Sequence, residues 1–555
     1  MKPLATALFA LAILPGCPEG GGGGTGDGGT TKDDGTRDAS RNEGTTDEGT
    51  RDNGTIDEET WDDGARDDGT WDAGTKDGGT WDAEQDDAGS GTEDGGTDSG
   101  VVVTPVALTE TKIAIRTHVY EQFLKTFPDG HPLHPYRTLD WDAFASSGRV
   151  EDVEYTAVIL ENEYVVLTVL PRLGGRIWRW QSKVTGRDQF YVNPAGIKPC
   201  HFSYLGWWLA SGGIEFSFPV EEHGYVFSVP WDYETSRDAD GSASIREWVT
   251  DAVSGLTLEV AVTLRPGRSD WEMEIAAANP TPKVVSYQLW LNAMLAPGGG
   301  ADTAGDTVFV YPTDTMIVHG GDAVLGNPRD LIPWPVHKGM DLSRYSTWLA
   351  GIDGAGLFVK DNAEPYVGSW VPSKNEGIVR VFDKDVPRGV KLWSFGRLKP
   401  TASADYANAN PPTAYYEIWG GVTDSFFDFA GFLPDGTVGW KERWAAPSGI
   451  GGLSRANDAT AVYLDAPASV AQNVTIAATV GAVPFSRSPD GNVRLVFDGR
   501  EVFNLDVALA PDAPMLAQVD FGIGLLPPGI YDLELVHDLR NGTTPLRDTR
   551  KIEVK

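Results

Sequence analysis

Short runs of β-branched and aromatic residues recur at nearly even spacing through most of this 555-residue chain. Val158–Leu160 and Tyr164–Leu170 are two examples, and the turn residues Pro171–Gly175 close the second. Gly, Pro, Asn and Asp interrupt such runs about every ten residues, and no long amphipathic helix stands out. A chain patterned in this way is expected to fold as an all-β sandwich or barrel.

The strand pattern begins near residue 101 and has a turn-rich break at Ala446–Gly452. The part before the break is too long for one immunoglobulin-type unit and predicts a single large β-sandwich over 101–450. The part after it, 456–555, carries roughly seven further strands and predicts a small immunoglobulin-like β-sandwich. No Cys–Trp–Cys spacing is present, so this second prediction concerns architecture only. We interpret the small sandwich as a structural module, with carbohydrate binding as the alternative.

The start of the chain has the order of a bacterial lipoprotein signal over residues 1–17. Met1–Lys2 and an apolar run precede Leu14–Gly16 and then Cys17. Cleavage before Cys17 and its acylation would anchor the protein by lipid, at roughly 0.8 kcal/mol for each buried methylene. We expect a place in the envelope of a Gram-negative-type bacterium, and Pro18 favours the outer membrane. The alternative is an ordinary secretory signal whose cysteine is incidental.

Residues 18–100 consist almost wholly of Gly, Thr, Asp and Glu. The tract holds 25 acidic and 6 basic residues and carries more than half of the net charge of −35. Such a segment cannot bury enough apolar surface to offset the entropy of ordering, so we expect a disordered acidic tether. Calcium binding by its repeated aspartates is the alternative, although a repeat of about five residues does not match known calcium-binding loops.

The remaining composition excludes several classes of partner and site. No cluster of Lys or Arg is present, which argues against nucleic acid as a partner. Once the lipobox cysteine is acylated, Cys200 has no partner, and we predict that it is a small buried residue. Asp302 and Asp306 lie among glycines and are a secondary candidate for calcium, while no other cofactor is expected. His131 and His134 are flanked by prolines and are expected to be surface contacts.

Tryptophan is concentrated in the predicted large sandwich. Of the 19 tryptophans, 16 lie outside the acidic tract, some in tight groups such as Trp207–Trp208. Aromatic faces suit sugars, because the C–H edges of a pyranose pack flat on a π surface while polar groups bind its hydroxyls. Neighbours on a strand point to opposite faces, so one member of this pair is expected to line a cleft. The alternative for many of the other tryptophans is that they fill the hydrophobic core.

Glu215 and His223 are the first candidates for chemistry. Glu215 follows Gly212–Gly213 and is surrounded by Ile, Phe and Pro, a setting that is expected to raise the pKa of its carboxyl group and to suit a general acid. His223 follows two glutamates, whose charge would favour imidazolium. The alternatives are that Glu215 is a structural carboxylate whose hydrogen bonds are made within the fold, and that His223 is a structural histidine.

Glu417 is the second carboxylate candidate. Strand alternation places Glu417 and Trp419 on one face and Tyr416 and Ile418 on the other. A carboxylate beside an indole is a plausible pair for sugar chemistry, with the base next to a stacking platform. The alternative is a glutamate on an edge strand.

Several short sequence motifs carry a family resemblance, and they occur in order between about residues 155 and 445. They include Leu160–Tyr164, Leu170–Trp178, Thr185–Asp188, Gly212–Phe216, Leu264–Arg268, Asn279–Thr281, Trp290–Ala293, Lys391–Gly396 and Tyr416–Trp419. The set resembles the galactose-mutarotase-like superfamily, and more closely an uncharacterised bacterial family of mutarotase-like domains often joined to tetratricopeptide repeats. The resemblance implies a β-supersandwich with a carbohydrate-binding cleft on one concave face.

The resemblance also implies roles for particular residues. In mutarotases proper, a late-strand glutamate acts as base on the anomeric hydroxyl and a histidine protonates the ring oxygen. Glu417 matches that glutamate, and His223 or His319 is the implied acid. A further set of positions is implied to contact the sugar: Arg176, Trp208, Asn292, His319 and Trp419.

Three functions stay open at this point. The protein is a sugar-binding lipoprotein that acts as an aldose 1-epimerase-like enzyme, or a glycoside hydrolase that uses Glu215 and Glu417, or a non-catalytic protein that binds glycan or another protein. A histidine and a glutamate facing a monosaccharide-sized pocket would favour the first. Two cleft carboxylates roughly 5–10 Å apart would favour the second.

Overall fold

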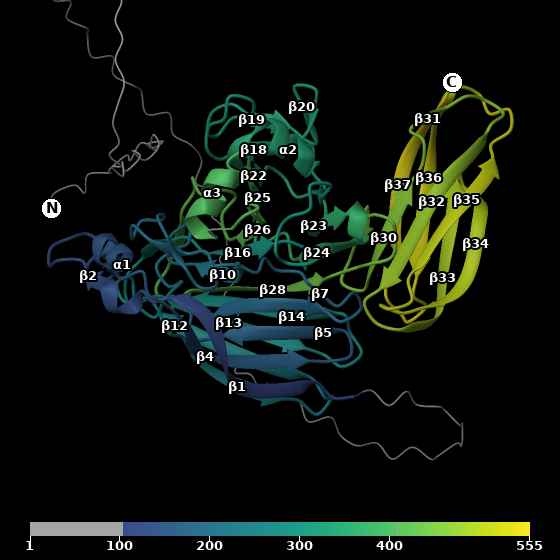
Figure 1. Ribbon diagram of the computed structural model, residues 1–555. Helices are drawn as coiled ribbons and strands as arrows, with labels where there is room; N and C mark the ends of the chain where they lie inside the picture. The colour runs from purple at the N-terminus through teal and green to yellow at the C-terminus, as the bar shows by residue number, and fades with distance from the viewer. Residues whose placement is uncertain (1–103, 408) are drawn as a thin grey trace, which may run out of the picture. The chain divides into compact units, whose positions relative to one another are not determined.

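The computed structural model describes residues 104–407 and 409–555. The predicted signal at 1–17 with Cys17, and the predicted tether at 18–100, lie outside the described residues. The α-helices of the described part are short, and none is long and apolar enough to cross a membrane. They are Trp141–Ser147 (α1), Tyr345–Gly351 (α2) and Lys399–Tyr406 (α3). Apart from two 3-10 helices, Glu121–Phe123 and Pro372–Lys374, the remaining regular structure of the described residues is β, which confirms the predicted all-β fold class (Figure 1).

Within the described residues, the larger of two main sheets has twelve strands in antiparallel pairs. In spatial order they are β1 (Ala107–His118), β4 (Val150–Glu161), β5 (Val165–Leu170), β6 (Arg176–Ser182), β10 (Gly213–Ser217), β16 (Trp290–Leu295), β26 (Tyr416–Gly421), β25 (Gly389–Gly396), β22 (Asp353–Val359), β18 (Thr315–Val318) and β19 (Leu331–Pro333), with β7 (Arg187–Asp188) paired to β6. Neighbouring strands in the middle of this sheet come from distant parts of the chain.

The second main sheet of the described residues has eight strands. In spatial order they are β11 (Asp232–Arg237), β12 (Ala243–Thr250), β13 (Thr257–Leu264), β14 (Asp270–Ala278), β28 (Thr437–Ala445), β24 (Glu376–Phe382), β23 (Tyr366–Val371) and β17 (Val308–Val310). Along β13, buried residues alternate with half-buried ones, as expected when one face of a strand meets a core. Leu258, Val260 and Val262 join that core together with Tyr416 and Ile418 of β26 from the larger sheet.

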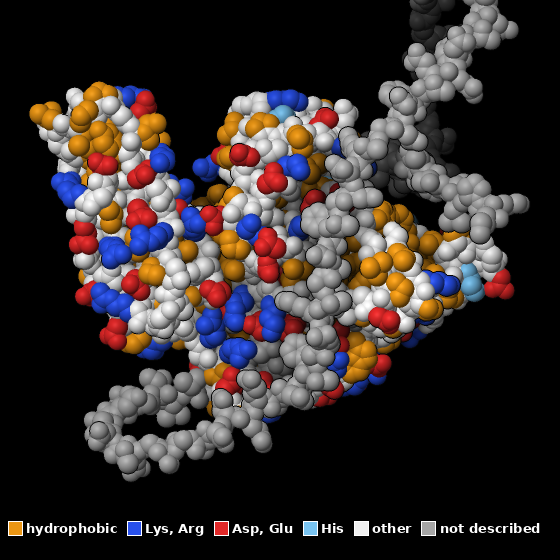
Figure 2. Space-filling model, turned by 180° about the vertical axis from the view of Figure 1, so that it is seen from behind, with side chains coloured by type: hydrophobic (Ala, Val, Ile, Leu, Met, Phe, Trp, Pro, Cys, Tyr) orange, Lys and Arg blue, Asp and Glu red, His pale blue; other side chains and the backbone are white. Residues whose placement is uncertain are grey.

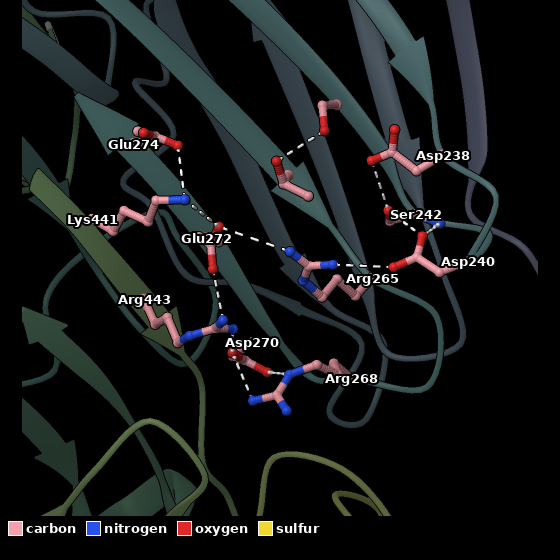
Figure 3. Close-up of polar contacts among 12 residues, drawn as sticks. Asp238, Asp240, Ser242, Arg265, Arg268, Asp270, Glu272, Glu274, Lys441 and Arg443 are labelled. Atoms are coloured by element: carbon pink, nitrogen blue, oxygen red, sulfur yellow. Dashed lines mark hydrogen bonds and ion pairs between the residues drawn. The ribbon is translucent and has the colours of Figure 1, made fainter. Parts of the chain in front are cut away.

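The outer face of the eight-stranded sheet carries a network of ion pairs (Figure 3). Asp270 is buried and accepts hydrogen bonds from Arg268 (2.7 Å) and Arg443 (2.9 Å). Arg443 also bonds Glu272 (2.6 Å), and Arg268 donates to the carbonyl of Asp458 (2.9 Å). Because these charges are paired with one another, we interpret the network as structural.

Residues from Arg455 onward form a smaller two-sheet sandwich. Its four-stranded sheet contains β29 (Arg455–Ala456), β30 (Thr460–Asp465), β32 (Thr475–Pro484) and β35 (Met515–Gly522). Its five-stranded sheet contains β31 (Ser469–Val470), β37 (Leu546–Val554), β36 (Gly529–Asp538), β33 (Ser488–Phe497) and β34 (Arg500–Leu509). A separate apolar cluster fills the space between these sheets. Two sheets packed in this way are typical of an immunoglobulin-like sandwich.

A segment that we call the strap, residues 120–147, lies next to the larger sheet. It contains β2 (Leu124–Thr126), β3 (Arg137–Leu139) and α1. Asp140 caps α1 by accepting a hydrogen bond from the Ala143 amide (3.2 Å). Tyr120 at the start of the strap packs on Trp207, with ring centroids 5.4 Å apart. The strap thereby helps to build a second apolar cluster, distinct from the core between the two main sheets.

On the face drawn in Figure 2, lysine and arginine side chains are interspersed with aspartate and glutamate. This mixture is typical of a protein surface without a strong field of one sign.

Candidate functional site

A cavity of about 210 Å³ lies beside β25 and β26 of the twelve-stranded sheet. Three tryptophans contribute to its wall: Trp208, Trp393 and Trp419. Seven acidic or basic side chains also line it: His201, Glu222, His223, His319, Lys391, Asp405 and Glu417. The volume is below the roughly 300–1,000 Å³ of pockets for drug-sized ligands, so the cavity suits one small ring.

Strand order explains why residues far apart in sequence meet here. β16 pairs with β10 on one side and with β26 on the other, which sets Asn292 opposite Glu215 and Trp419. The Asn292 side-chain amide lies 3.4 Å from Oε1 of Glu215 and 3.2 Å from Oε1 of Glu417. The two predicted carboxylates are therefore brought together, although only Glu417 lines the cavity.

Glu215 is sealed behind the cavity wall. Arg176 donates to its Oε2 (2.9 Å), Trp208 donates to the same oxygen (2.9 Å), and His223 Nδ1 bonds its Oε1. Burial alone would raise the pKa of the Glu215 carboxyl, but His223, Arg176 and Trp208 together lower that pKa below its usual value. The expected raised pKa is wrong, because the sequence did not reveal these three donors.

The glycines before Glu215 allow this close packing. A Cβ at Gly213 would lie 2.3 Å from the carbonyl oxygen of Ile177 on the neighbouring strand β6, and Gly213 has a φ of +79°. Glycine therefore lets β10 approach β6, the strand that begins with Arg176.

His223 is held in an unusual backbone conformation. Glu222 (φ +51°), His223 (φ +75°) and Gly224 (φ +59°) follow one another in the left-handed region, which is costly for side chains that have a Cβ. The His223 amide donates to Ser217 Oγ (2.9 Å), and its ring packs on Trp208 with centroids 4.1 Å apart. Because Nδ1 faces Glu215, Nε2 is the nitrogen left for a ligand.

Glu417 projects from β26 into the cavity together with Trp419. The indole Nε1 of Trp419 donates to Oε2 of Glu417 (2.7 Å). Burial raises the pKa of the Glu417 carboxyl, and this effect outweighs the opposing influence of His223, Lys391, Trp419 and Asn292. A carboxylate with a raised pKa is the stronger base, so Glu417 is suited to accept a proton from a ligand.

Sequence reasoning missed two charged residues of the site, Glu222 and Lys391. Although burial opposes it, hydrogen bonding to His319 (3.0 Å) and the charge of Lys391 lower the pKa of Glu222 to about 2. Burial lowers the pKa of His319, and the positive charge of Lys391 adds to that effect. A signal for Lys391 was present, since it is the single charged residue in the strand-like run 389–396.

Lys391 lies on β25 opposite Trp419 and Phe358. Its Nζ is 4.6 Å from the ring centroid of Trp419 and 4.2 Å from that of Phe426, and among the described residues no carboxylate pairs with it within 4.0 Å. Burial lowers the pKa of the Lys391 ammonium to about 8, although Glu222 and Glu417 favour its charged form. The cavity thus contains an ammonium close to two carboxylates.

The other predicted contacts divide into two groups. Trp208, His319 and Trp419 line the cavity. Arg176 and Asn292 are fully buried and are not part of its wall, so the structure does not bring these two implied sugar contacts into the cavity lining. Arg176 also donates to the carbonyl of Gly212 (3.0 Å), and it orients the Glu215 strand instead.

Cys200 and the histidines outside the cavity take structural positions. Cys200 lines the cavity but is 3% exposed, and burial raises the pKa of its thiol to about 12, which leaves it a poor nucleophile. His131 stacks on Phe127 with centroids 4.5 Å apart, and His134 bonds the carbonyl of Phe127 (2.8 Å).

The predicted calcium candidates have other partners. Asp302 pairs with Lys399 (2.6 Å), and Asp306 accepts hydrogen bonds from the amide and hydroxyl of Ser373 (2.7 and 3.1 Å). In the part of the chain that the structure describes, no group of three or more His, Cys, Asp or Glu side chains could hold a metal ion. Asp302 instead joins its loop to the start of α3, and Asp306 joins its loop to the 3-10 helix Pro372–Lys374.

Comparison with known proteins agrees with the fold. A family model described as a domain of unknown function (DUF5107) matches residues 128–431. A solved TPR-domain containing protein from Parabacteroides distasonis ATCC 8503 is 23% identical with a TM-score of 0.53, over 64% of this chain and 58% of that protein. The present chain therefore spans less than two thirds of that relative.

Galactose mutarotase-like proteins are also similar in structure. The one from Clostridium acetobutylicum is 10% identical with a TM-score of 0.37, over 53% of this chain and 96% of that protein. The one from Lactobacillus casei ATCC 334 is 11% identical with a TM-score of 0.37, over 52% and 99%. Both kinds of protein that the sequence resembles, mutarotase-like proteins and a TPR-domain containing protein, are thus among the similar structures.

Proposed function

The chain belongs to the family of the domain of unknown function DUF5107, and from that premise we propose that its cavity binds one sugar ring on which Glu417 and His223 perform acid/base chemistry. One observation carries the proposal. A carboxylate and an imidazole line the same small cavity, and tryptophan rings form part of its wall. Such a site supports an aldose 1-epimerase-like activity.

The proposed reaction interconverts the two anomers of a reducing sugar. Glu417 accepts the proton of the anomeric hydroxyl while His223 donates its Nε2 proton to the ring oxygen. The bond between the anomeric carbon and the ring oxygen breaks, and the anomeric C–O bond becomes a carbonyl. Rotation of the carbonyl and reversal of both proton transfers close the ring as the other anomer. Protons and electrons balance without a cofactor.

Glu215 acts as a positioning residue in this scheme. Its carboxylate accepts a hydrogen bond from Nδ1 of His223 and so orients the imidazole, as a buried carboxylate does for histidine in other acid/base pairs. Arg176 balances the charge of Glu215, so the pair adds no net charge behind the cavity. A mutation of Glu215 should therefore lower the rate more than it weakens sugar binding.

The hydrolase alternative is less well supported. Its proposed pair was Glu215 and Glu417, but Glu215 does not line the cavity. Glu222 does line it, yet a carboxyl group with a pKa of about 2 cannot keep the proton that a general acid donates at neutral pH. In the non-catalytic alternative, the protein would bind its ligand in the same cavity without turning it over.

We also propose that the protein is a lipoprotein of the bacterial cell envelope, because Leu14–Gly16 and Cys17 have the order of a lipobox. Labelling cells with radioactive palmitate tests this proposal. The wild type is expected to carry label and Cys17→Ser is expected to lose it. Equal labelling of the two proteins would contradict the lipid anchor.

Exchange between anomers measured by NMR tests the enzymatic proposal directly. D-galactose and D-glucose are suitable first substrates, with sugar binding followed in parallel by calorimetry. Glu417→Gln is expected to lower the exchange rate about 10²–10⁴-fold while sugar still binds. Binding without accelerated exchange in the wild type would favour the non-catalytic alternative. Absence of binding across a panel of reducing sugars would refute the proposal.

A further inference from the structure

The loop 201–207 borders the cavity and exposes two aromatic rings. Phe202 lines the cavity and is 49% exposed, while Tyr204 is 47% exposed. Two tryptophan rings of the cavity wall are more buried: Trp208 is 6% and Trp419 is 1% exposed. Phe202 therefore stands where the cavity meets solvent, with half of its surface in water.

The loop is held in place although it exposes these rings. Three of its hydrogen bonds are made with the strap: Thr138 Oγ1 to the Leu205 carbonyl (2.7 Å), Trp141 Nε1 to the Gly206 carbonyl (2.9 Å), and Trp207 Nε1 to the Arg137 carbonyl (3.0 Å). His201 stacks on Trp141 with ring centroids 3.5 Å apart. Ser203 adopts a left-handed backbone (φ +66°), which the surrounding contacts must maintain. A ring presented in this way loses little entropy when a ligand binds.

Phe202 also lies next to the chemistry. Its ring stands nearly perpendicular to that of His223, with centroids 5.3 Å apart and planes at 83°. Tyr204 lies on the same loop as Phe202. Its hydroxyl donates a hydrogen bond to Glu221 (2.5 Å), and this bond fixes the Tyr204 ring. One pyranose occupies most of a cavity of about 210 Å³, so any sugar linked to it must lie outside, at a border that includes Phe202.

We propose that Phe202 stacks a second pyranose, and that the ligand of this site is the terminal unit of an oligosaccharide rather than a free monosaccharide. This inference rests on the proposed function. The exposed aromatic ring supplies the apolar platform that the C–H face of a sugar needs. The strap then has a role, because it holds the loop that presents the platform.

Calorimetry with matched sugars tests the second position. D-galactose is compared with β-1,4-galactobiose, and D-glucose with cellobiose, so that the same sugar enters the cavity whichever end binds. The variants are Phe202→Ala and Phe202→Tyr. Phe429→Ala is the control, because Phe429 is 55% exposed and does not line the cavity.

In the wild type the disaccharide of at least one pair is expected to bind more tightly than its monosaccharide. Phe202→Ala should reduce this preference about two- to tenfold, as expected for loss of one stacking contact. Phe202→Tyr and Phe429→Ala should retain the preference. An unchanged preference in Phe202→Ala, or monosaccharides that bind as tightly as their disaccharides, would overturn the inference and leave the proposed function standing. Failure of every sugar to bind would refute both.

Discussion

Glu247 on β12 should make this protein less stable as the pH rises. Its side chain is fully buried, and neither carboxylate oxygen has a hydrogen-bond partner among the described residues. Its strand neighbours in register are Tyr233 and Val260. Burial raises the pKa of the Glu247 carboxyl from 4.5 to about 8, so the folded protein keeps it protonated at neutral pH.

The sign and size of this pH effect on stability follow from the difference between the pKa values of Glu247 in the folded and unfolded protein. A raised pKa in the folded state means that the contribution to stability is fully present below pH 4.5 and is lost as the pH rises through 8. At 1.36 kcal/mol per pKa unit, the loss is about 1 kcal/mol at pH 5, about 3 at pH 7 and about 5 at pH 9. Glu247→Gln keeps the size and the neutral state of the protonated side chain and removes its titration.

Urea unfolding of the wild type and Glu247→Gln at pH 5, 7 and 9 measures the difference. The variant should gain stability relative to the wild type by about 2.5 kcal/mol between pH 5 and pH 7, and by about 1.4 kcal/mol more between pH 7 and pH 9. Glu154→Gln serves as control, because Glu154 is exposed on β4 and its replacement should give no such trend. A constant difference between wild type and Glu247→Gln across this range would refute the reasoning.

Three further predictions concern other buried ionisable groups. Glu215→Gln should destabilise the fold by about 3–5 kcal/mol, because it leaves the Arg176 guanidinium buried without its counter-charge; denaturant unfolding measures this, and a loss below about 1 kcal/mol would contradict the ion-pair assignment. Burial lowers the pKa of His537 in the small sandwich to about 4, so stability should fall as the pH drops from 6.5 through 4. His537→Gln should reduce that fall by about 3 kcal/mol at pH 4. Thermal unfolding measures this, and an equal loss of stability with falling pH in the wild type and the variant would contradict it. Lys391→Met removes a positive charge that lowers the pKa of Glu417, so the acid limb of the rate profile for anomer exchange should move to higher pH, and an unshifted limb would show that the two groups are not coupled.

The candidate site shows how far sequence reasoning reaches. The shared face of Glu417 and Trp419 was predicted, because side chains on a strand alternate whatever the strand packs against. Alternation also predicted that one member of the pair Trp207–Trp208 lines a cleft, while the choice of Trp208, which does line the cavity, came from the family resemblance. The ionisation of Glu215 was not predicted, because its pKa depends on donors from β6 and from the loop that holds His223.

Sequence alone determined the all-β class and the faces of individual strands, since both follow from a two-residue period that is a local property of the chain. It did not determine which strands are neighbours. The order β6, β10, β16, β26 and β25 places Arg176, Asn292 and Lys391 in one part of the sheet, although they are distant in sequence. It also decides that Glu215 is sealed while Glu417 lines the cavity. Those differences come from pairing between remote strands and from burial, neither of which is encoded by residue spacing.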